Sequence, residues 1–220
     1  MLTTVLRTSL PVAFGYLPLG MAFGVLLVGL GYAWWWAAVM SVFIFAGSAQ
    51  FLAVGLLAAG AGAVDSFVAT LLLNLRHVFY GLAMLDRYQS LGRGRNYAVF
   101  GLTDETFSLL AGLPPHAQDR RWVLGITALN QFWWVAGSVV GAVIGRSLPF
   151  STEGLAFALT ALFAVLLVEQ MLRGFRPAAL VGALFGAVGC LVLLPGKYFL
   201  IASMGFAALV LGFLPKRAVE

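Results

Sequence analysis

The feature that most constrains this chain is a run of 57 residues, from Thr8 to Val64, that contains no Asp, Glu, Lys or Arg. As one continuous helix the run would be about 85 Å long, nearly three times the ~30 Å hydrocarbon core of a bilayer. It must therefore fold back on itself. The glycine-rich sequence at 29–32 is the best place for the reversal, which predicts one helix near 9–29 and a second near 33–59.

The composition agrees with a membrane location. Hydrophobic residues make up 62% of the 220 residues and charged residues 10%, and the mean hydropathy is +0.99. A chain of this size cannot bury so much apolar side chain in a water-soluble core, because its surface must stay largely polar. The composition excludes a soluble enzyme, a nucleic-acid-binding protein and, with Cys190 as the one cysteine, a disulfide scaffold. The net charge of +5 is typical of a membrane protein whose cytoplasmic loops are rich in Lys and Arg.

The rest of the chain continues the helical pattern. A third helix is predicted near 66–86, and a shorter segment, 97–113, carries Asp104 and Glu105 at its centre. Four longer apolar spans follow, near 122–145, 154–172, 177–194 and 198–214. Their length of about 18–24 residues and their all-round apolar character are typical of membrane helices and not of barrel strands.

We therefore expect an all-α, polytopic integral membrane protein with about seven transmembrane helices, a short re-entrant or broken segment and a kinked first helix. The chain is interpreted as a single membrane-embedded transport domain, 1–220, with 1–113 and 122–220 as candidate repeat-like halves. If 97–113 is re-entrant, the basic residues on both its flanks lie inside, as the positive-inside rule favours, and the N-terminus lies outside. A topology with eight crossings remains open.

Prolines and glycines mark the first two spans. Pro11 and Pro18 each remove an amide donor, so we expect the first helix to be broken or kinked between residues 11 and 20. Discontinuous helices with freed backbone amides are common substrate platforms in transporters. Close packing between helices is the alternative role for the glycines of this stretch.

Polar side chains within the spans are the strongest candidates for function, because Asp or Arg at the bilayer centre costs about 2.5–3.5 kcal/mol. Asn74, His77 and Tyr80 share one face of the third helix, and Arg76 is rotated about 100° from them. An ion pair between Arg76 and an acid that only holds helices together is the structural alternative. The candidate substrate-binding or coupling residues are Gly15, Pro18, Gly20, Gly47, Ser48, Gln50, Asn74, Arg76, His77, Tyr80, Thr103, Asp104 and Glu105.

Four segments resemble motifs of a known family. FGYLPLGMAFG at 14–24, FAGSAQF at 45–51, NLRHVFYG at 74–81 and LTDETF at 102–107 are similar, in this order, to the AzlC family, the large subunits of branched-chain amino-acid exporters. The resemblance spans nearly the whole chain. It implies a multi-pass protein of the inner membrane, export of valine, leucine, isoleucine and related amino acids such as methionine, and a small AzlD-type membrane subunit as partner. Ala156 stands where a relative often carries an acid, so a role for that acid does not carry over.

A zwitterionic amino acid needs a partner for its carboxylate, a partner for its ammonium and an apolar pocket. Freed helix-terminal amides or the Arg76 guanidinium suit the carboxylate, and Asp104 or Glu105 suits the ammonium. His77 is the natural protonation switch, because an unperturbed histidine titrates at about pH 6.5. The chain has no phosphate-binding loop motif, which favours secondary, proton-coupled transport.

Other classes of function are less well supported. No cofactor, metal site or catalytic residue is predicted, since the two histidines, His77 and His116, are far apart in sequence and no metal-binding pattern surrounds them. A passive channel for small polar solutes and a non-enzymatic membrane scaffold subunit remain the alternatives.

Overall fold

Helices form all the regular structure that the computed structural model describes, and no strand occurs in residues 2–113, 119–147 and 177–194. These ranges, with the single positions 164, 168, 202, 203, 205, 206 and 209, are the described part of the chain. The chain divides into two compact units. The first is formed by Met1–Ala59 and Asn74–Ala156, and the second by Gly60–Leu73 and Phe157–Glu220.

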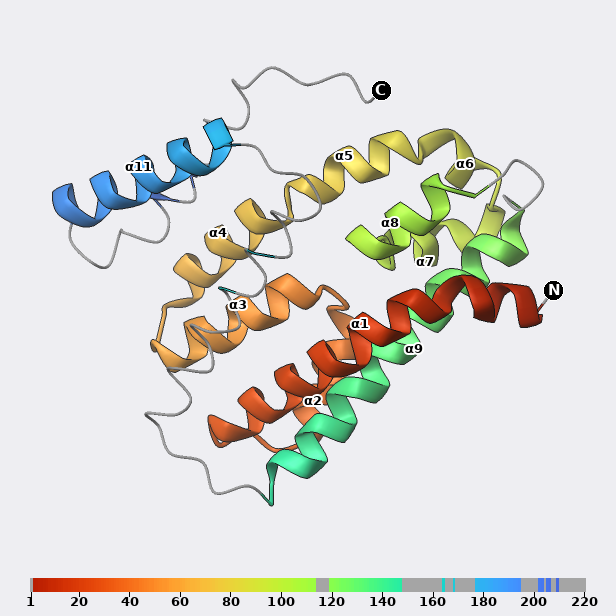
Figure 1. Ribbon diagram of the computed structural model, residues 1–220, viewed down its shortest axis with the longest axis horizontal. Helices are drawn as coiled ribbons and strands as arrows, with labels where there is room; N and C mark the ends of the chain where they lie inside the picture. Colours follow the sequence, from red (N-terminus) through yellow and green to blue (C-terminus); the bar gives the residue numbers. More distant parts are fainter. Residues whose placement is uncertain are drawn as a thin grey trace. The chain divides into compact units, whose positions relative to one another are not determined.

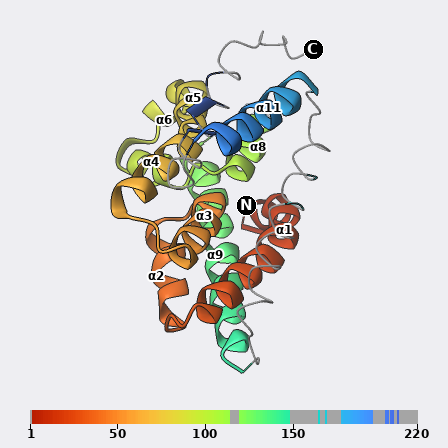
Figure 2. The ribbon, with the colours of Figure 1, turned by 90° about the vertical axis from the view of Figure 1, so that its left-hand side faces the viewer.

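Two long helices, α1 (Leu2–Gly29) and α9 (Arg120–Gly145), lie side by side and form the centre of the first unit (Figures 1 and 2). A Cβ atom on Gly20 would lie 2.9 Å from main-chain atoms of α9, and one on Gly137 would lie 2.7 Å from the Leu17 carbonyl oxygen. The two backbones therefore touch through glycine, as expected for membrane helices that associate by close packing.

Of the two predicted forms of the first helix, broken or kinked, the break does not occur. α1 continues through Pro11 and Pro18 without interruption, although its ribbon bends (Figure 1). A proline in a membrane helix removes one hydrogen bond, and packing against a neighbouring helix is enough to hold the rest. Here α9 lies along α1 and supplies that packing. The amides between Gly15 and Gly20 are therefore not freed by a break.

The discontinuity lies instead in the second predicted helix, 33–59. This segment forms two helices, α2 (Trp35–Phe43) and α3 (Gly47–Ala58). Between them Phe45 has a φ of 41°, in the left-handed region that is unfavourable for a bulky residue. Its buried ring packs 6.4 Å from the rings of both Tyr16 and Phe100, and this tertiary packing outweighs the local preference.

The third predicted helix is interrupted as well. It begins at Ala63 and comprises α4 (Ala63–Asn74) and α5 (Arg76–Ala83), with Leu75 outside both helices. Two short helices, α6 (Leu85–Gln89) and the 3-10 helix η1 (Gly92–Gly94), follow it. The interruption therefore falls inside the polar motif that begins at Asn74.

The segment 97–113 is broken, as predicted. It forms α7 (Arg95–Phe100) and α8 (Asp104–Ala111), separated by three residues. At 1.5 Å per residue the two helices are about 9 and 12 Å long, so neither alone crosses a ~30 Å hydrocarbon core. The re-entrant path of the segment stays a prediction.

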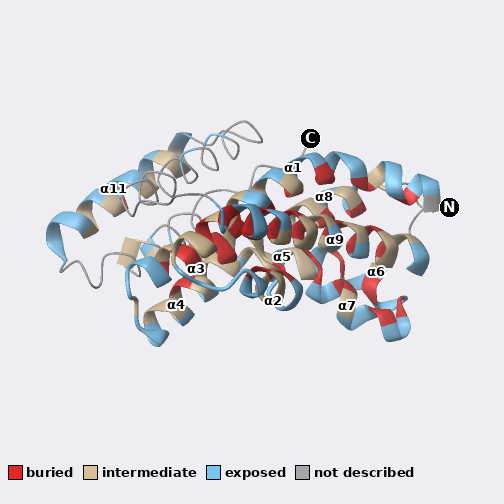
Figure 3. Cartoon of the chain, turned by 90° about the horizontal axis from the view of Figure 1, so that it is seen from below, coloured by how far each residue is buried: buried red, intermediate tan, exposed pale blue. Residues whose placement is uncertain are grey.

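The described helices bear out an integral membrane protein. Within the described residues three helical spans are long and apolar enough to cross a membrane: Thr3–Gly29, Ala63–Ala83, which comprises α4 and α5, and Arg120–Gly145. Large apolar side chains such as Phe14 and Phe132, 78% and 56% exposed, lie on outer faces where lipid would cover them. Buried residues gather where α1, α3 and α9 meet (Figure 3).

In the second unit α11 (Pro177–Leu193) agrees with the predicted span near 177–194. The predicted spans 154–172 and 198–214 fall largely on residues outside the described ranges, and so does the departure at Ala156. The predicted repeat-like halves stay a prediction.

Candidate functional site

The first turns of three helices meet at one ion pair. Arg76, the first residue of α5, places its Nη1 atom 2.7 Å from Oδ2 of Asp104, the first residue of α8. The Nη2 atom of the same guanidinium donates to the Ser48 hydroxyl in α3 at 2.8 Å. The fork of the guanidinium therefore joins α3, α5 and α8.

Helix N-termini make this region attractive to anions. No side chain caps the first turn of α3 or α5, whereas Thr103 caps α8 by accepting a hydrogen bond from the Thr106 amide. The positive end of the α8 dipole stabilises the carboxylates of Asp104 and Glu105 in its first turn. Together with Arg76, this arrangement explains how two adjacent acids are tolerated in an apolar chain.

Glu105 belongs to a second set of contacts that reaches α1 and α9. The Tyr16 hydroxyl donates to Oε2 of Glu105 at 2.7 Å and lies 2.7 Å from the Thr103 hydroxyl. The Thr103 hydroxyl is in turn 3.0 Å from that of Thr106, which accepts from the Asn130 amide at 3.1 Å. Tyr16, Thr103, Thr106 and Asn130 are all buried. We call these residues, with Glu105, the hydroxyl chain.

Three enclosed polar atoms of this region have no hydrogen-bond partner among the described residues, two of them in the ion pair itself and the third on Asn74, two residues before Arg76. They are Oδ1 of Asn74, Nε of Arg76 and Oδ1 of Asp104. Leaving a buried polar atom unpaired costs about 1–3 kcal/mol, and more for a charged group. Two acceptors and one donor therefore have unused hydrogen-bonding capacity in this region.

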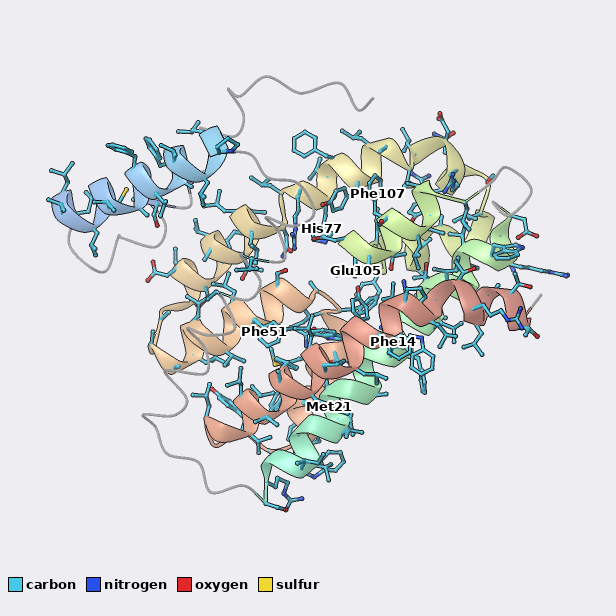
Figure 4. The ribbon with its side chains drawn as sticks, viewed as in Figure 1. Phe14, Met21, Phe51, His77, Glu105 and Phe107 are labelled. Carbon is cyan, nitrogen blue, oxygen red and sulfur yellow. The ribbon has the colours of Figure 1, made fainter. Side chains whose placement is uncertain are left out.

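Aromatic rings border the ion pair between α5 and α8. The Tyr80 ring stacks on Phe107 at 4.6 Å and meets the edge of the His77 ring at 5.7 Å. The Nδ1 atom of His77 lies 3.2 Å from the Asn74 carbonyl oxygen. Figure 4 shows His77, Glu105 and Phe107 in the region where α5 and α8 approach each other, apart from Phe14 and Met21 on α1.

Gln50 lies in a separate buried network. Its side chain accepts from the Trp134 indole at 2.7 Å and donates to Ser41 at 3.1 Å, and Ser41 donates to Ser138 at 2.8 Å. The Trp134 ring also covers Gly47, where a Cβ atom would lie 3.0 Å from the ring. This network fixes the start of α3 against α9, and its hydrogen-bonding capacity is used internally.

The family follows from a comparison with known proteins. The family model described as AzlC protein matches residues 11–148, which include every polar group described above. The chain belongs to the AzlC family. No solved structure matches it.

Several AzlC-family relatives have names that bear on a role. The branched-chain amino acid transport protein AzlC of Bacillus subtilis is 36% identical over 89% of this chain and 78% of its own length. An uncharacterized membrane protein of Helicobacter pylori is 37% identical over 95% of this chain and 92% of its own. The inner membrane protein YgaZ of Escherichia coli is 33% identical over 82% and 78%. The chain is a multi-pass membrane protein with a transport role.

Within this AzlC-family chain the predicted candidates divide into groups. Ser48, Arg76 and Asp104 are in direct contact, and Asn74, His77, Tyr80, Thr103 and Glu105 lie beside them or in the hydroxyl chain. Gly20 lies in the α1–α9 interface, and Gly47 and Gln50 contact Trp134. Gly15 and Pro18 are exposed on α1, and the described contacts do not bring them to the ion pair.

Sequence reasoning did not single out Tyr16 or Trp134. Tyr16 falls within the family-like segment 14–24, and that was the one signal that could have found it. Trp134 is one of six tryptophans in a largely apolar chain, and nothing in its neighbourhood distinguishes it from an interfacial residue. Among the described residues no three His, Cys, Asp or Glu side chains gather to hold a metal.

Proposed function

We propose that this chain exports the branched-chain amino acids valine, leucine and isoleucine, and methionine, across the cell membrane as a secondary, proton-coupled transporter. The observation that carries the proposal is the Arg76–Asp104 ion pair with one unpaired, enclosed atom on each partner, together with the unpaired Oδ1 of Asn74 two residues before Arg76. An ammonium group has three donors and suits the two acceptors, Oδ1 of Asn74 and Oδ1 of Asp104. A carboxylate suits the donor, Nε of Arg76, and the uncapped first turns of α3 and α5.

A zwitterion is the ligand class that satisfies both charges at once. A lone anion would leave the Asp104 oxygen unpaired, and a lone cation would do the same for Arg76 Nε, at a cost of about 1–3 kcal/mol each. Phe107 and Tyr80 supply apolar surface beside the ion pair. A surface of this kind separates ligands that differ by one methylene by only about 1–3 kcal/mol, so overlap among aliphatic amino acids is expected.

The proposal includes a partner subunit. The resemblance to AzlC proteins supports a small AzlD-type membrane protein as that partner, and the name of the Bacillus relative supports branched-chain amino acids as substrates. In the proposed mechanism Arg76 and Asp104 separate from each other as the substrate charges replace them, and they pair again after release.

The direct test loads cells with valine-containing dipeptides and follows valine efflux. Cells carry this chain alone, this chain with its AzlD-type partner, or neither. We expect efflux against the valine gradient only when the chain is present, and loss of that efflux in Asp104→Asn. Asp86→Asn, which changes an exposed carboxylate in α6, is the matched control and should export normally.

The alternatives give different results in the same cells. A passive channel would equilibrate valine but not move it uphill. A scaffold subunit would produce no efflux in any combination. Either result would remove the exporter proposal.

A further inference from the structure

The two adjacent carboxylates, Asp104 and Glu105, have different partners. Asp104 pairs with Arg76 and keeps one oxygen unpaired, whereas Glu105 accepts from Tyr16, a buried residue of α1. Adjacent residues of one helical turn thus face different parts of the first unit. This difference suggests that the two acids have separate tasks.

The hydroxyl chain can be ordered in two directions with the same heavy-atom positions. With Glu105 ionised, Tyr16 donates to Glu105, as in the structure, and Thr103 donates to Tyr16. Thr106 then donates to Thr103, the reverse of the direction that the structure gives for this contact. With a proton on Glu105, that proton is donated to the Tyr16 oxygen, Tyr16 donates to Thr103, and Thr103 to Thr106. A hydroxyl has one donor and two acceptor sites, so each contact is filled once in both orders.

The remaining contacts of the chain fit both orders. The Thr103 oxygen accepts from the Thr106 amide at 3.2 Å, which uses one of its two acceptor sites in either direction. The Thr106 oxygen accepts from Asn130, whose own side-chain oxygen accepts from Ser9 of α1 at 2.7 Å. What changes is the direction of the Thr106 hydroxyl, which must find another acceptor once Thr103 donates to it. Protonation of Glu105 therefore changes the hydrogen bonds at the place where α1, α8 and α9 meet.

We propose that Glu105 carries the proton coupled to transport, and that Tyr16 is the positioning residue that relays its protonation state through Thr103 and Thr106 to α1 and α9. In this assignment Asp104 binds the transported amino acid, and Glu105 binds the proton that is coupled to transport. The inference rests on the proposed function, and its test separates the two.

The groups around Glu105 allow this role. Tyr16 faces it from α1, Asp104 lies beside it in α8, and His77 and Tyr80 of α5 interact with it electrostatically. The charged residue of α5, Arg76, pairs with Asp104. From α9 comes Asn130, which is polar but does not titrate. His77 is less suited to pass on a protonation change, because its described hydrogen bond goes to Asn74 at the end of the preceding helix. Because the sequence predicted His77 as the protonation switch, the test below also includes the variant His77→Gln.

The test uses the full chain in liposomes, with its partner subunit if export requires it. Two quantities are measured: exchange of labelled valine for internal valine as a function of pH, and accumulation of valine against its gradient driven by an imposed pH difference. In Glu105→Gln we expect accumulation to fall at least tenfold and exchange to become independent of pH. We expect the same in Tyr16→Phe and Thr103→Val, whereas Thr103→Ser keeps both the helix cap and the relay and should behave as the parent chain.

The outcomes are distinct. Proton-driven accumulation that persists in Glu105→Gln overturns the inference, as does a normal pH profile in Tyr16→Phe. Loss of the pH dependence in His77→Gln, with Glu105→Gln unaffected, assigns the proton to His77 instead. If the parent chain exchanges valine but ignores the pH difference, this inference and the proton coupling of the proposed function both fail, whereas amino-acid transport by the chain stands. If the parent chain exchanges no amino acid, the proposed function itself fails. A melting temperature for each purified variant separates loss of coupling from loss of fold.

Discussion

At the scale of single residues, Arg76 is the centre of the site because its fork reaches two helices at once. One nitrogen pairs with Asp104 and another donates to Ser48, while Nε is left for a ligand. A lysine would keep the charge but present a single point donor.

We predict that Arg76→Lys lowers valine efflux by about tenfold or more, since losing one charge-assisted hydrogen bond costs about 1.5–3 kcal/mol and 1.4 kcal/mol is a factor of ten. The measurement is the initial rate of efflux at matched membrane abundance. Arg121→Lys, an exposed arginine at the start of α9, is the control and should keep the parent rate. Equal rates for the two variants would contradict the role given to the fork.

Tyr88 provides a test of stability that is independent of transport. Its side chain is only 2% exposed, and its hydroxyl has no partner among the described residues. It packs within a buried apolar cluster that includes Val5, Leu91 and Leu110. We predict that Tyr88→Phe stabilises the protein by about 1 kcal/mol, because an unpaired buried hydroxyl is removed while the ring stays. The measurement is the midpoint of thermal unfolding of the purified protein in detergent, and a lower midpoint would show that the hydroxyl is satisfied.

The same residue predicts a pH effect of known sign. Burial raises the pKa of Tyr88 from its ordinary value of 10.0 to about 12, with a smaller opposing effect from Arg87. Between pH 10 and pH 12 the unfolded chain therefore loses this proton while the folded chain keeps it, so stability falls as the pH rises. In Tyr88→Phe this part of the alkaline loss should be absent. A parallel fall in both proteins over that range would contradict it.

The contact between Arg76 and an acid could be predicted from the sequence for a physical reason, while the part of these residues in transport stays a prediction. Arg76 and Asp104 are costly in an apolar environment, so their presence in predicted spans indicates that they need each other or a ligand. Tyr16 is uncharged and costs little free energy in a membrane helix, so the sequence gives no comparable reason to single it out. Its part in the site depends on which side of α1 faces α8, and that is set by packing with α9 and not by local sequence.

At the scale of helices, the α1–α9 interface depends on particular glycines. A Cβ on Gly20 would lie 2.9 Å from main-chain atoms of α9, which cannot move away without shifting the helix, whereas a Cβ on Gly15 meets nothing within 4 Å. We predict that Gly20→Ala destabilises the protein by about 1–3 kcal/mol through overpacking. Gly15→Ala, on the same helix, should be neutral or stabilise it by up to about 1 kcal/mol, because alanine favours helix. Melting temperatures of the two variants check this, and equal shifts would mean that the interface tolerates a methyl group.

The helix breaks show where local sequence is a poor guide. Pro11 and Pro18 predicted a broken or kinked first helix, and α1 bends but stays continuous because packing along α9 supports it. An interruption occurs instead in the second predicted helix, at Phe45. This residue type has no helix-breaking preference, and aromatic neighbours hold it at a positive φ. A tertiary cause of this kind leaves no mark in the composition of the segment.

At the scale of the whole molecule, the path of the segment between Arg95 and Ala111 decides the topology. α7 and α8 are each too short to cross the membrane alone. Backbone without helical hydrogen bonds is tolerated at membrane depth only where protein buries it, and Gly101, Leu102 and Thr103 between the two helices are buried. Both features favour a segment that enters and leaves on one side.

The single cysteine makes this topology measurable. In a Cys190→Ser background we introduce one cysteine before the segment, as Gln89→Cys, or after it, as Gln118→Cys, and neither change alters the charge that orients the loops. A re-entrant segment predicts that a membrane-impermeant maleimide labels both positions in inside-out vesicles and neither in right-side-out vesicles. Labelling from opposite sides would make the segment a full crossing and give the chain one more transmembrane pass. Asp104, the ion-pair partner of Arg76, would then lie within a crossing segment and not in a loop that enters and leaves on one side.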